Sequence, residues 1–501
     1  MSRRKKRFYF NLFGICAVIF WLLMLGALVK KVHFKSSANA SSYAQASKSI
    51  SSLQRDWREI YLKDKKVGYA VSSIKPFENG YFIQEENILR VNLMDFGGSL
   101  YTLTQCKVDR NFFLQSFYLL MSSGVVRFSL SGKVQAGVLI IATGKGKEKK
   151  IHKIRLKTRP MIEIGVPYFL KTQKFKVGNS FTFPVFDPSS MSQKELVVKV
   201  TGKENLRINR ITYNAFLLET HMWGKTLHIW VDKNGSILKE EGFMGLTVVK
   251  SSAARAPENL ERDKGIDLYE IAAISPDRKL PNPSHLGFLK LKIEGVDTES
   301  FPAKALNSVR QKFNNGVLEI KREALPVSAP YTVPFVDPPP WLDPYLKPEF
   351  NIESDNGKIK EKALEIRGED QNPISVSRKL MGWVYRNLEK RPVLSIPSAL
   401  EALRTRIGDC NEHATLLTAL LRASGIPARL AVGLVYVHDR FYYHAWTEAY
   451  LGKWVSIDPT LDQMPADATH IKLLEGNLEK QAEIAGLIGE IKLKVLGFGY
   501  D

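Results

Sequence analysis

One segment near the C-terminus constrains the fold most, because it joins a cysteine to a helix that must be buried. Residues 408–413 read Gly-Asp-Cys-Asn-Glu-His, and ATLLTALLRASGIPAR follows. Four leucines of this run share one apolar stripe: Leu416, Leu417, Leu420 and Leu421. The spacing predicts a buried helix that ends near Gly425. Cys410 is expected in its first turn, where free N–H groups and the helix dipole favour a thiolate and can bind an oxyanion.

Three predicted strands follow this helix and carry a histidine and an acid. Residues 429–437, 441–451 and 454–460 read as consecutive strands joined by tight turns. Alternation places His444 on one face of the middle strand, together with Trp446. Asp458 lies near the end of the next strand, and cross-strand neighbours are about 5 Å apart. The carboxylate is therefore expected to reach the imidazole.

These blocks resemble a known family. GDCNEHATLLTALLRASGIPAR and YYHAWTEAYLGKWVSIDPT are similar to the core of the transglutaminase-like superfamily, over roughly residues 345–475. The resemblance implies a papain-like catalytic fold that attacks an amide-type carbon. It also implies that Cys410 is the nucleophile, His444 the general base and acid, and Asp458 the residue that orients the imidazole. The tail, residues 476–496, is similar to the ending of exported bacterial members.

Four further residues are candidates for the substrate cleft. Tyr443 and Trp446 flank the histidine and could form a cleft wall, although core packing explains them equally well. Glu412 and His413 follow the cysteine and could tune the thiolate, although an acid at a helix start is also common for dipole reasons. No second oxyanion donor stands out.

The remaining cysteines and histidines suggest neither a disulfide scaffold nor a metal. Only Cys16 and Cys106 accompany Cys410. A Cys106–Cys410 disulfide is the alternative that would remove the thiol. Three histidines lack any recognised ligand spacing: His413, His438 and His444. No metal and no cofactor are predicted.

The amino terminus carries a long apolar run. Residues 8–29 contain a single polar residue in 22 positions and, at about 1.5 Å per residue, would span roughly 33 Å as a helix. Because the basic excess precedes the run, we expect a single-pass inner (cytoplasmic) membrane protein with residues 36–501 on the periplasmic or extracellular side. Residues 1–35 are then a basic tip and anchor, and residues 36–53 a flexible linker. A signal peptide cleaved at Ala38-Asn39-Ala40 is the alternative.

Residues 54–255 alternate apolar and polar residues in short runs. Asn79-Gly80 and Asn234-Gly235 supply tight-turn signals, so we predict an antiparallel β domain. Its opening, WREIYLKDKKVGYAVSSI, resembles the first hairpin of periplasmic half-barrel proteins of the lipoprotein-carrier type. That resemblance implies a groove for a lipid or an anionic polymer; a plain spacer is the alternative.

The rest of the chain divides at a proline-rich connector. Residues 256–325 read as a small basic mixed region, and eight of the 24 prolines fall in residues 326–348. Consecutive prolines favour an extended, semi-rigid connector, which could also lie along the cleft as an occluding strap. Residues 349–501 complete the catalytic domain. The predicted fold class is α+β: an N-terminal transmembrane helix, an antiparallel β-rich domain, the connector and a papain-like transglutaminase-like domain.

Charge and motif together indicate a function. The net charge is +21, and residues 1–35 carry eight Lys/Arg and no acid, which leaves 21 − 8 = +13. This surplus favours anionic partners, but no nucleic-acid motif is present. We expect a thiol enzyme that cleaves amide bonds in a protein or peptide substrate at the cell envelope, a peptidase or amidase rather than a crosslinking enzyme. The alternative is an inactive binding or scaffolding protein.

Overall fold

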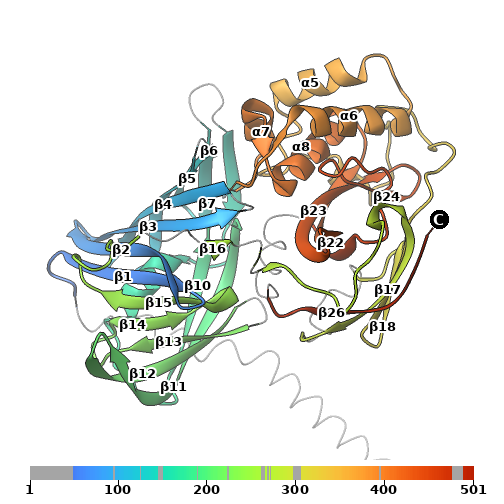
Figure 1. Ribbon diagram of the computed structural model, residues 1–501. Coiled ribbons are helices and arrows are strands. Elements are labelled where there is room, and N and C mark those ends of the chain that lie inside the picture. Colours follow the sequence, from blue (N-terminus) through green and yellow to red (C-terminus); the bar gives the residue numbers. More distant parts are fainter. Residues whose placement is uncertain are drawn as a thin grey trace, which may run out of the picture.

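The computed structural model consists of a large β sheet packed beside a smaller domain of helices and strands (Figure 1). It describes residues 49–93, 96–124, 126–144, 150–188, 190–222, 225–260, 266–267, 270, 272–296, 306–393, 396–476 and 489–500.

The first part is a single sheet of 16 strands among the described residues. Its first eight strands are β1 (Gln54–Leu62), β2 (Lys65–Phe77), β3 (Gly80–Leu93), β4 (Phe96–Asp109), β5 (Leu114–Ser123), β6 (Val126–Gln135), β7 (Val138–Thr143) and β8 (Lys150–Arg155). The others are β9 (Met161–Ile162), β10 (Ser180–Asp187), β11 (Ser192–Ile208), β12 (Ile211–Met222), β13 (Lys225–Val231), β14 (Ile237–Glu241), β15 (Leu246–Ser251) and β16 (Ile266–Asp267).

Sequential hairpins build this sheet. The strand order runs from β8 back to β1, then through β15 back to β9, while β16 pairs with β3. The predicted turns are present: Gly80 begins β3, and Gly235, between β13 and β14, has the positive φ of 77° that a tight turn requires. β1 pairs with β15 from Trp57↔Ser251 to Leu62↔Leu246, which joins the two runs of hairpins in the middle of the sheet, with β8 and β9 at the two ends of the strand order.

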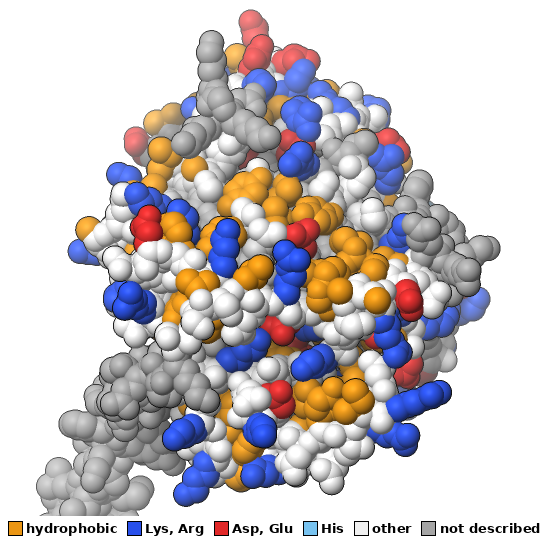
Figure 2. All heavy atoms as spheres, turned by 90° about the vertical axis from the view of Figure 1, so that its left-hand side faces the viewer, with side chains coloured by type: hydrophobic (Ala, Val, Ile, Leu, Met, Phe, Trp, Pro, Cys, Tyr) orange, Lys and Arg blue, Asp and Glu red, His pale blue; other side chains and the backbone are white. Residues whose placement is uncertain are grey.

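Aromatic side chains fill the core of this domain. Phe112, Phe169, Phe183 and Phe186 are buried in one cluster, to which the helix α2 (Val166–Leu170) also contributes after the turn η3 (Glu163–Gly165). On the outer face, Lys and Arg side chains are interspersed with apolar ones (Figure 2). The lipid or anionic polymer expected at this domain stays a prediction.

The second part contains four helices among the described residues, two four-stranded sheets and one short strand pair. The helices are α5 (Gly357–Arg367), α6 (Pro373–Asn387), α7 (Ala399–Thr405) and α8 (Cys410–Ala423). One sheet has the order β24-β23-β22-β25, formed by β22 (Ala428–Val437), β23 (Arg440–Tyr450), β24 (Trp454–Ile457) and β25 (Ile471–Glu475). The other has the order β18-β19-β17-β26, formed by β17 (Leu286–Glu294), β18 (Gln311–Asn314), β19 (Val317–Lys321) and β26 (Lys492–Tyr500). β20 (Glu389–Lys390) pairs with β21 (Ile407–Gly408). Short 3₁₀ turns in this part are η5 (Pro283–His285) and η7 (Asp343–Tyr345), while η4 (Phe243–Gly245) lies between β14 and β15 in the first part.

The long-range pairing of β17 and β26 determines where the strands of the predicted basic mixed region lie. Instead of forming a separate unit, β17–β19 share a sheet with the C-terminal strand β26. Their apolar side chains belong to the same core as helix α8. Strands β17–β19 are therefore built into the C-terminal part of the molecule, whereas β16 belongs to the first sheet.

The proline-rich connector packs at the end of the domain away from Cys410. The Phe335 N–H donates to the Gly425 carbonyl, which lies just beyond the last turn of α8. The Tyr331 hydroxyl donates to the carbonyl of Tyr450, the last residue of β23. Cys410 begins α8, so these contacts lie at the opposite end of that helix.

Two parts of the predicted architecture need correction. Strands hold 49% and helices 16% of the described residues, so the described part of the chain is β-rich and the predicted α+β class is wrong. Nowhere in the described ranges is a helix long and apolar enough to cross a bilayer. The predicted span, residues 8–29, lies outside those ranges, as does most of the linker 36–53. The predicted transmembrane helix and single-pass inner-membrane location, with residues 36–501 on one side of a membrane, are therefore not supported.

Candidate active site

Cys410 is the first residue of α8, where the sequence pattern predicts it. Asp409 caps the helix: its side chain accepts a hydrogen bond from the Asn411 N–H at 2.8 Å. The Asp409 N–H in turn donates to Glu412 Oε2 at 3.0 Å, which completes a capping box. The stripe of leucines is fully buried beneath this turn. Local sequence therefore fixes where the thiol lies.

The thiol is free and half-buried. Cys106 is also free, and it is buried within the β sheet of the first part. The alternative of a Cys106–Cys410 disulfide is therefore wrong.

His444 and Asp458 are joined by a short hydrogen bond. His444 lies on β23, and Asp458 directly follows β24. His444 Nε2 is 2.7 Å from Asp458 Oδ2, and both side chains are buried. Asp458 Oδ1 accepts from the backbone N–H groups of Thr460 at 2.7 Å and Leu461 at 3.2 Å. Although burial alone would raise it, the two histidines bonded to Asp458 hold the pKa of this carboxyl well below its usual value.

Strand β23 also contacts the thiol. The backbone N–H of Ala445, the residue after His444, donates a hydrogen bond to the Cys410 sulfur. This N–H group is not used in pairing with β24, because β24 pairs with β23 only from Thr447 onward. No hydrogen bond joins His444 Nδ1 to any residue that the structure describes. The nitrogen that faces away from Asp458 is therefore left to act on a proton.

The charge state of Cys410 differs from the expectation. Burial, followed by the Asp409 carboxylate, raises the pKa of the Cys410 thiol well above its ordinary value, while the Ala445 N–H lowers it. The predicted stabilisation by the helix terminus is therefore outweighed, because desolvation favours the neutral form. Cys410 is a thiol at neutral pH until a base accepts its proton.

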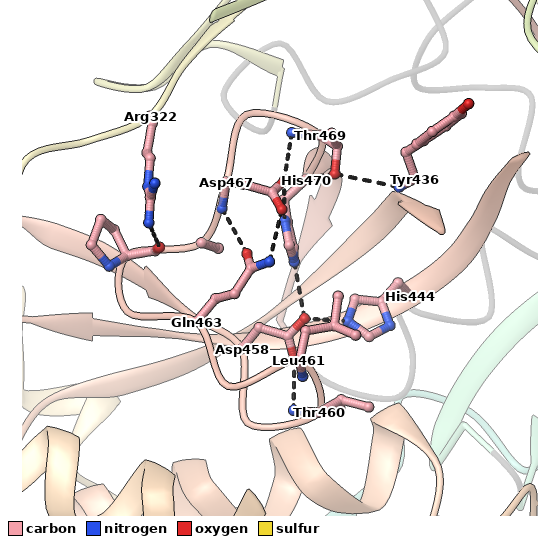
Figure 3. A network of polar contacts seen from close by, with 12 residues as sticks. Arg322, Tyr436, His444, Asp458, Thr460, Leu461, Gln463, Asp467, Thr469 and His470 are labelled. Carbon is pink, nitrogen blue, oxygen red and sulfur yellow. Dashed lines mark hydrogen bonds and ion pairs between the residues drawn. The ribbon is translucent and has the colours of Figure 1, made fainter. Parts of the chain in front are cut away.

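A second histidine, missed by the sequence reasoning, joins this group. His470 precedes β25, and its Nε2 lies 2.9 Å from Asp458 Oδ2 (Figure 3). Its Nδ1 lies 3.2 Å from Asp467 Oδ1. The only sequence signal is an Asp-x-x-His spacing at residues 467–470. This spacing does not by itself predict a contact with Asp458, because that contact depends on how the loop between them folds.

The four predicted cleft residues are mostly buried. Trp446 has no exposed surface and packs against the rings of His444 and His470, so it does not wall an open cleft. Glu412 is buried in the capping box, and burial, then Asp409, raises the pKa of its carboxyl. His413 is fully buried with Nδ1 2.7 Å from the Asp409 carbonyl. Burial lowers the pKa of this imidazole. Tyr443 is half-buried and packs against the core.

One group of side chains in the described ranges has metal-ligand spacing. The donor atoms of His444, Asp458 and His470 lie within 4.8 Å of one another. However, both imidazoles direct N–H groups at the same Asp458 oxygen, and hydrogen bonds to Asp458 and Asp467 overcome burial to raise the pKa of His470 to about 9. A metal would have to displace these protons. The donors therefore fit a hydrogen-bonded chain better than a metal site.

Comparisons with known proteins match the two parts separately. A model of the transglutaminase-like superfamily matches residues 360–459. A model of DUF3108, a family of unknown function, matches residues 66–241. No match is found among curated proteins.

Three solved structures are similar at low identity. A proposed cysteine protease from Cytophaga hutchinsonii is 21% identical over 43% of this chain and 90% of its own, with a TM-score of 0.30. A β-barrel-like DUF1849 protein from Brucella abortus is 12% identical over 41% of this chain and 97% of its own, with a TM-score of 0.30. The periplasmic domain of TgpA from Pseudomonas aeruginosa, bound to ethylmercury, is 17% identical over 36% of this chain and 91% of its own, with a TM-score of 0.22. These scores are too low to carry an argument. Residues 360–459 therefore form a domain of the transglutaminase-like superfamily.

Proposed function

We propose that the chain is a cysteine enzyme that cleaves amide bonds in a protein or peptide substrate. The observation that carries the proposal is the meeting of α8 and β23. There the Cys410 sulfur accepts a hydrogen bond from the residue after His444, and His444 donates to Asp458 at 2.7 Å. A thiol, an imidazole and a buried carboxylate in this order have the roles that nucleophilic acyl transfer requires.

The reaction begins with a proton transfer. His444 Nδ1 takes the proton of the Cys410 thiol, and the sulfur attacks the carbonyl carbon of the substrate. As the C–N bond breaks, the imidazolium returns the proton to the leaving amine, and a thioester remains on Cys410. Asp458 keeps the Nε2–H of His444 in place, so that Nδ1 is the basic nitrogen throughout. Because burial disfavours the free thiolate, this transfer accompanies substrate attack.

The capping pattern of α8 points to an oxyanion donor. The N–H groups of Asn411 and Glu412 are used by the Asp409 side chain, and that of His413 by the Asp409 carbonyl. The Cys410 N–H has no hydrogen-bond partner in the described part of the chain. It is the first-turn donor nearest the sulfur, so it would bind the oxygen of the tetrahedral intermediate.

The second half of the reaction decides between hydrolysis and crosslinking. If water attacks the thioester, His444 accepts its proton, a carboxylic acid leaves and the thiol is restored. If a substrate amine attacks, an isopeptide bond forms. We favour hydrolysis, since Cys410 is partly open to solvent and water is the most abundant acceptor there.

The test compares the purified wild-type chain with Cys410→Ala on a cell extract. Mass spectrometry would read new peptide termini, deamidated glutamines and isopeptide bonds. New termini or deamidation that depend on Cys410 support hydrolysis, and isopeptide bonds would show crosslinking. Identical peptide maps from both proteins, together with no faster alkylation of Cys410 than of Cys106, would favour the inactive binding protein.

A further inference from the structure

The Asp458 carboxylate accepts hydrogen bonds from two histidines rather than one. Its Oδ2 atom lies 2.7 Å from His444 Nε2 and 2.9 Å from His470 Nε2. Figure 3 shows Asp458 between the two rings, with His470 on the side of the loop and His444 on the side of the strand. Whatever holds His470 in place therefore also fixes the oxygen that orients His444.

His470 is held from its other nitrogen. Nδ1 lies 3.2 Å from Asp467 Oδ1, and the ring is fully buried between the two carboxylates. Asp467 is in turn fixed by the Thr469 N–H at 2.8 Å, the Thr469 hydroxyl at 2.6 Å and the Gln463 side-chain amide at 2.8 Å. These bonds make the loop from Asp458 to His470 a rigid support.

The ring lies between two anions, so both nitrogens act as donors. The ionisable groups that face it are Asp458, Asp467 and His444; Trp446 packs edge-on against it without charge. An imidazole that donates from both nitrogens is an imidazolium. Burial opposes this charge, but the bonds to Asp458 and Asp467 outweigh it and raise the pKa of His470 to about 9.

We propose that His470 is a positioning residue for the Cys410–His444 pair, which it serves by fixing the Asp458 oxygen that receives the Nε2–H of His444. The inference rests on the proposed function, in which His444 Nδ1 must stay unprotonated to take the thiol proton. Without His470, Asp458 Oδ2 keeps only the bond from His444 itself, and the other oxygen keeps its two backbone bonds. The carboxylate could then rotate, and His444 would lose its fixed tautomer.

Two neutral variants separate this role from a general effect on folding. In His470→Gln, the amide nitrogen can occupy the Nε2 position and still donate to Asp458. In His470→Asn, the shorter side chain reaches only the Nδ1 position and cannot contact Asp458. The measurement is the rate of alkylation of Cys410 by iodoacetamide at pH 7, read peptide by peptide, with the melting temperature of each variant.

We expect His470→Asn to react about 10- to 100-fold more slowly than wild type, the scale of a lost charge-assisted hydrogen bond. His470→Gln should recover much of this rate. The matched control is Thr447→Val, a buried position on β23 whose hydroxyl bonds to Thr418 and the Ala414 carbonyl, outside this network. A His470→Asn rate equal to that of Thr447→Val, or equal losses in the Asn and Gln variants, would overturn the proposal.

Two further variants keep the outcome decisive. If His470→Asn does not fold, Asp467→Asn retains His470 but removes the carboxylate on Nδ1, and it too should react more slowly than the control. An equal rate would refute the inference. His444→Ala separates the two claims. If Cys410 in this variant reacts as fast as in wild type, the proposed function fails. If His444→Ala reacts more slowly but the His470 and Asp467 variants react at the wild-type rate, the function stands and the role of His470 is wrong.

Discussion

The buried charge on His470 makes the stability of the protein depend on pH in a defined direction. In the folded chain the pKa of His470 is about 9, and in the unfolded chain it should be near the ordinary value of 6.5. A group whose pKa is raised by folding stabilises the folded state while it is protonated in both states. Its contribution is therefore complete below pH 6.5 and is lost as the pH rises through 9.

The difference between the two pKa values sets the size of the effect. At about 1.4 kcal/mol per unit, values of about 9 and 6.5 correspond to about 3 kcal/mol of unfolding free energy. The two acids that face the ring do not obscure this effect, because folding lowers the pKa of Asp467 to about 2 and lowers that of Asp458 as well. Both acids stay ionised across this range.

Urea unfolding at pH 6 and pH 10 measures this contribution. The comparison is between wild type and His470→Gln, since all other titrating groups are common to both proteins. From pH 6 to pH 10, the unfolding free energy of wild type should fall by about 3 kcal/mol more than that of the variant. Equal losses, or a wild type that gains stability relative to the variant, would show that His470 is neutral in the folded protein and refute the reasoning.

Three other perturbations test different parts of the structure. Alkylation of Cys410 should accelerate steadily from pH 6 to pH 10 because its thiol pKa is raised; a rate that is flat over this range, measured by mass spectrometry, would contradict that. Gly433→Ala would place a Cβ 1.8 Å from the Ile471 carbonyl oxygen. We therefore expect the unfolding free energy, measured with urea, to fall by about 1–3 kcal/mol and Cys410 alkylation to slow. Unchanged values would refute the β22–β25 contact. Leu420 is fully buried in α8, so Leu420→Ala should lower the unfolding free energy by about 2–5 kcal/mol. Leu364 is 58% exposed on α5, so Leu364→Ala should lower it by less than about 0.5 kcal/mol. Similar losses of stability in calorimetry would argue against the buried helix.

The sequence predicts best what is decided locally. Helix α8 follows from its apolar stripe and its capping residues, and the hairpin of β22 and β23 follows from alternation around a turn. His444 and Asp458 meet because they lie on adjoining segments of that same sheet. Each of these features depends on residues close together in the chain, where periodicity and turn chemistry are informative.

The sequence fails where distant segments meet. The pairing of β17 with β26 joins residues about two hundred positions apart, and no local pattern specifies it. His470 reaches Asp458 only because the loop between them folds back. The raised pKa of Cys410 comes mainly from desolvation, which depends on the surrounding packing, whereas the sequence displays only the helix terminus that opposes it.

The central claim is that His444 accepts the proton of the Cys410 thiol. The most direct test is the rate of iodoacetamide alkylation of Cys410 at pH 7 in the wild type and in His444→Ala, with Cys106 as the internal reference. The variant should react at least about tenfold more slowly, since the thiol then loses the base proposed to take its proton and its own raised pKa keeps it protonated. Equal rates in the two proteins would show that the imidazole does not act on this sulfur.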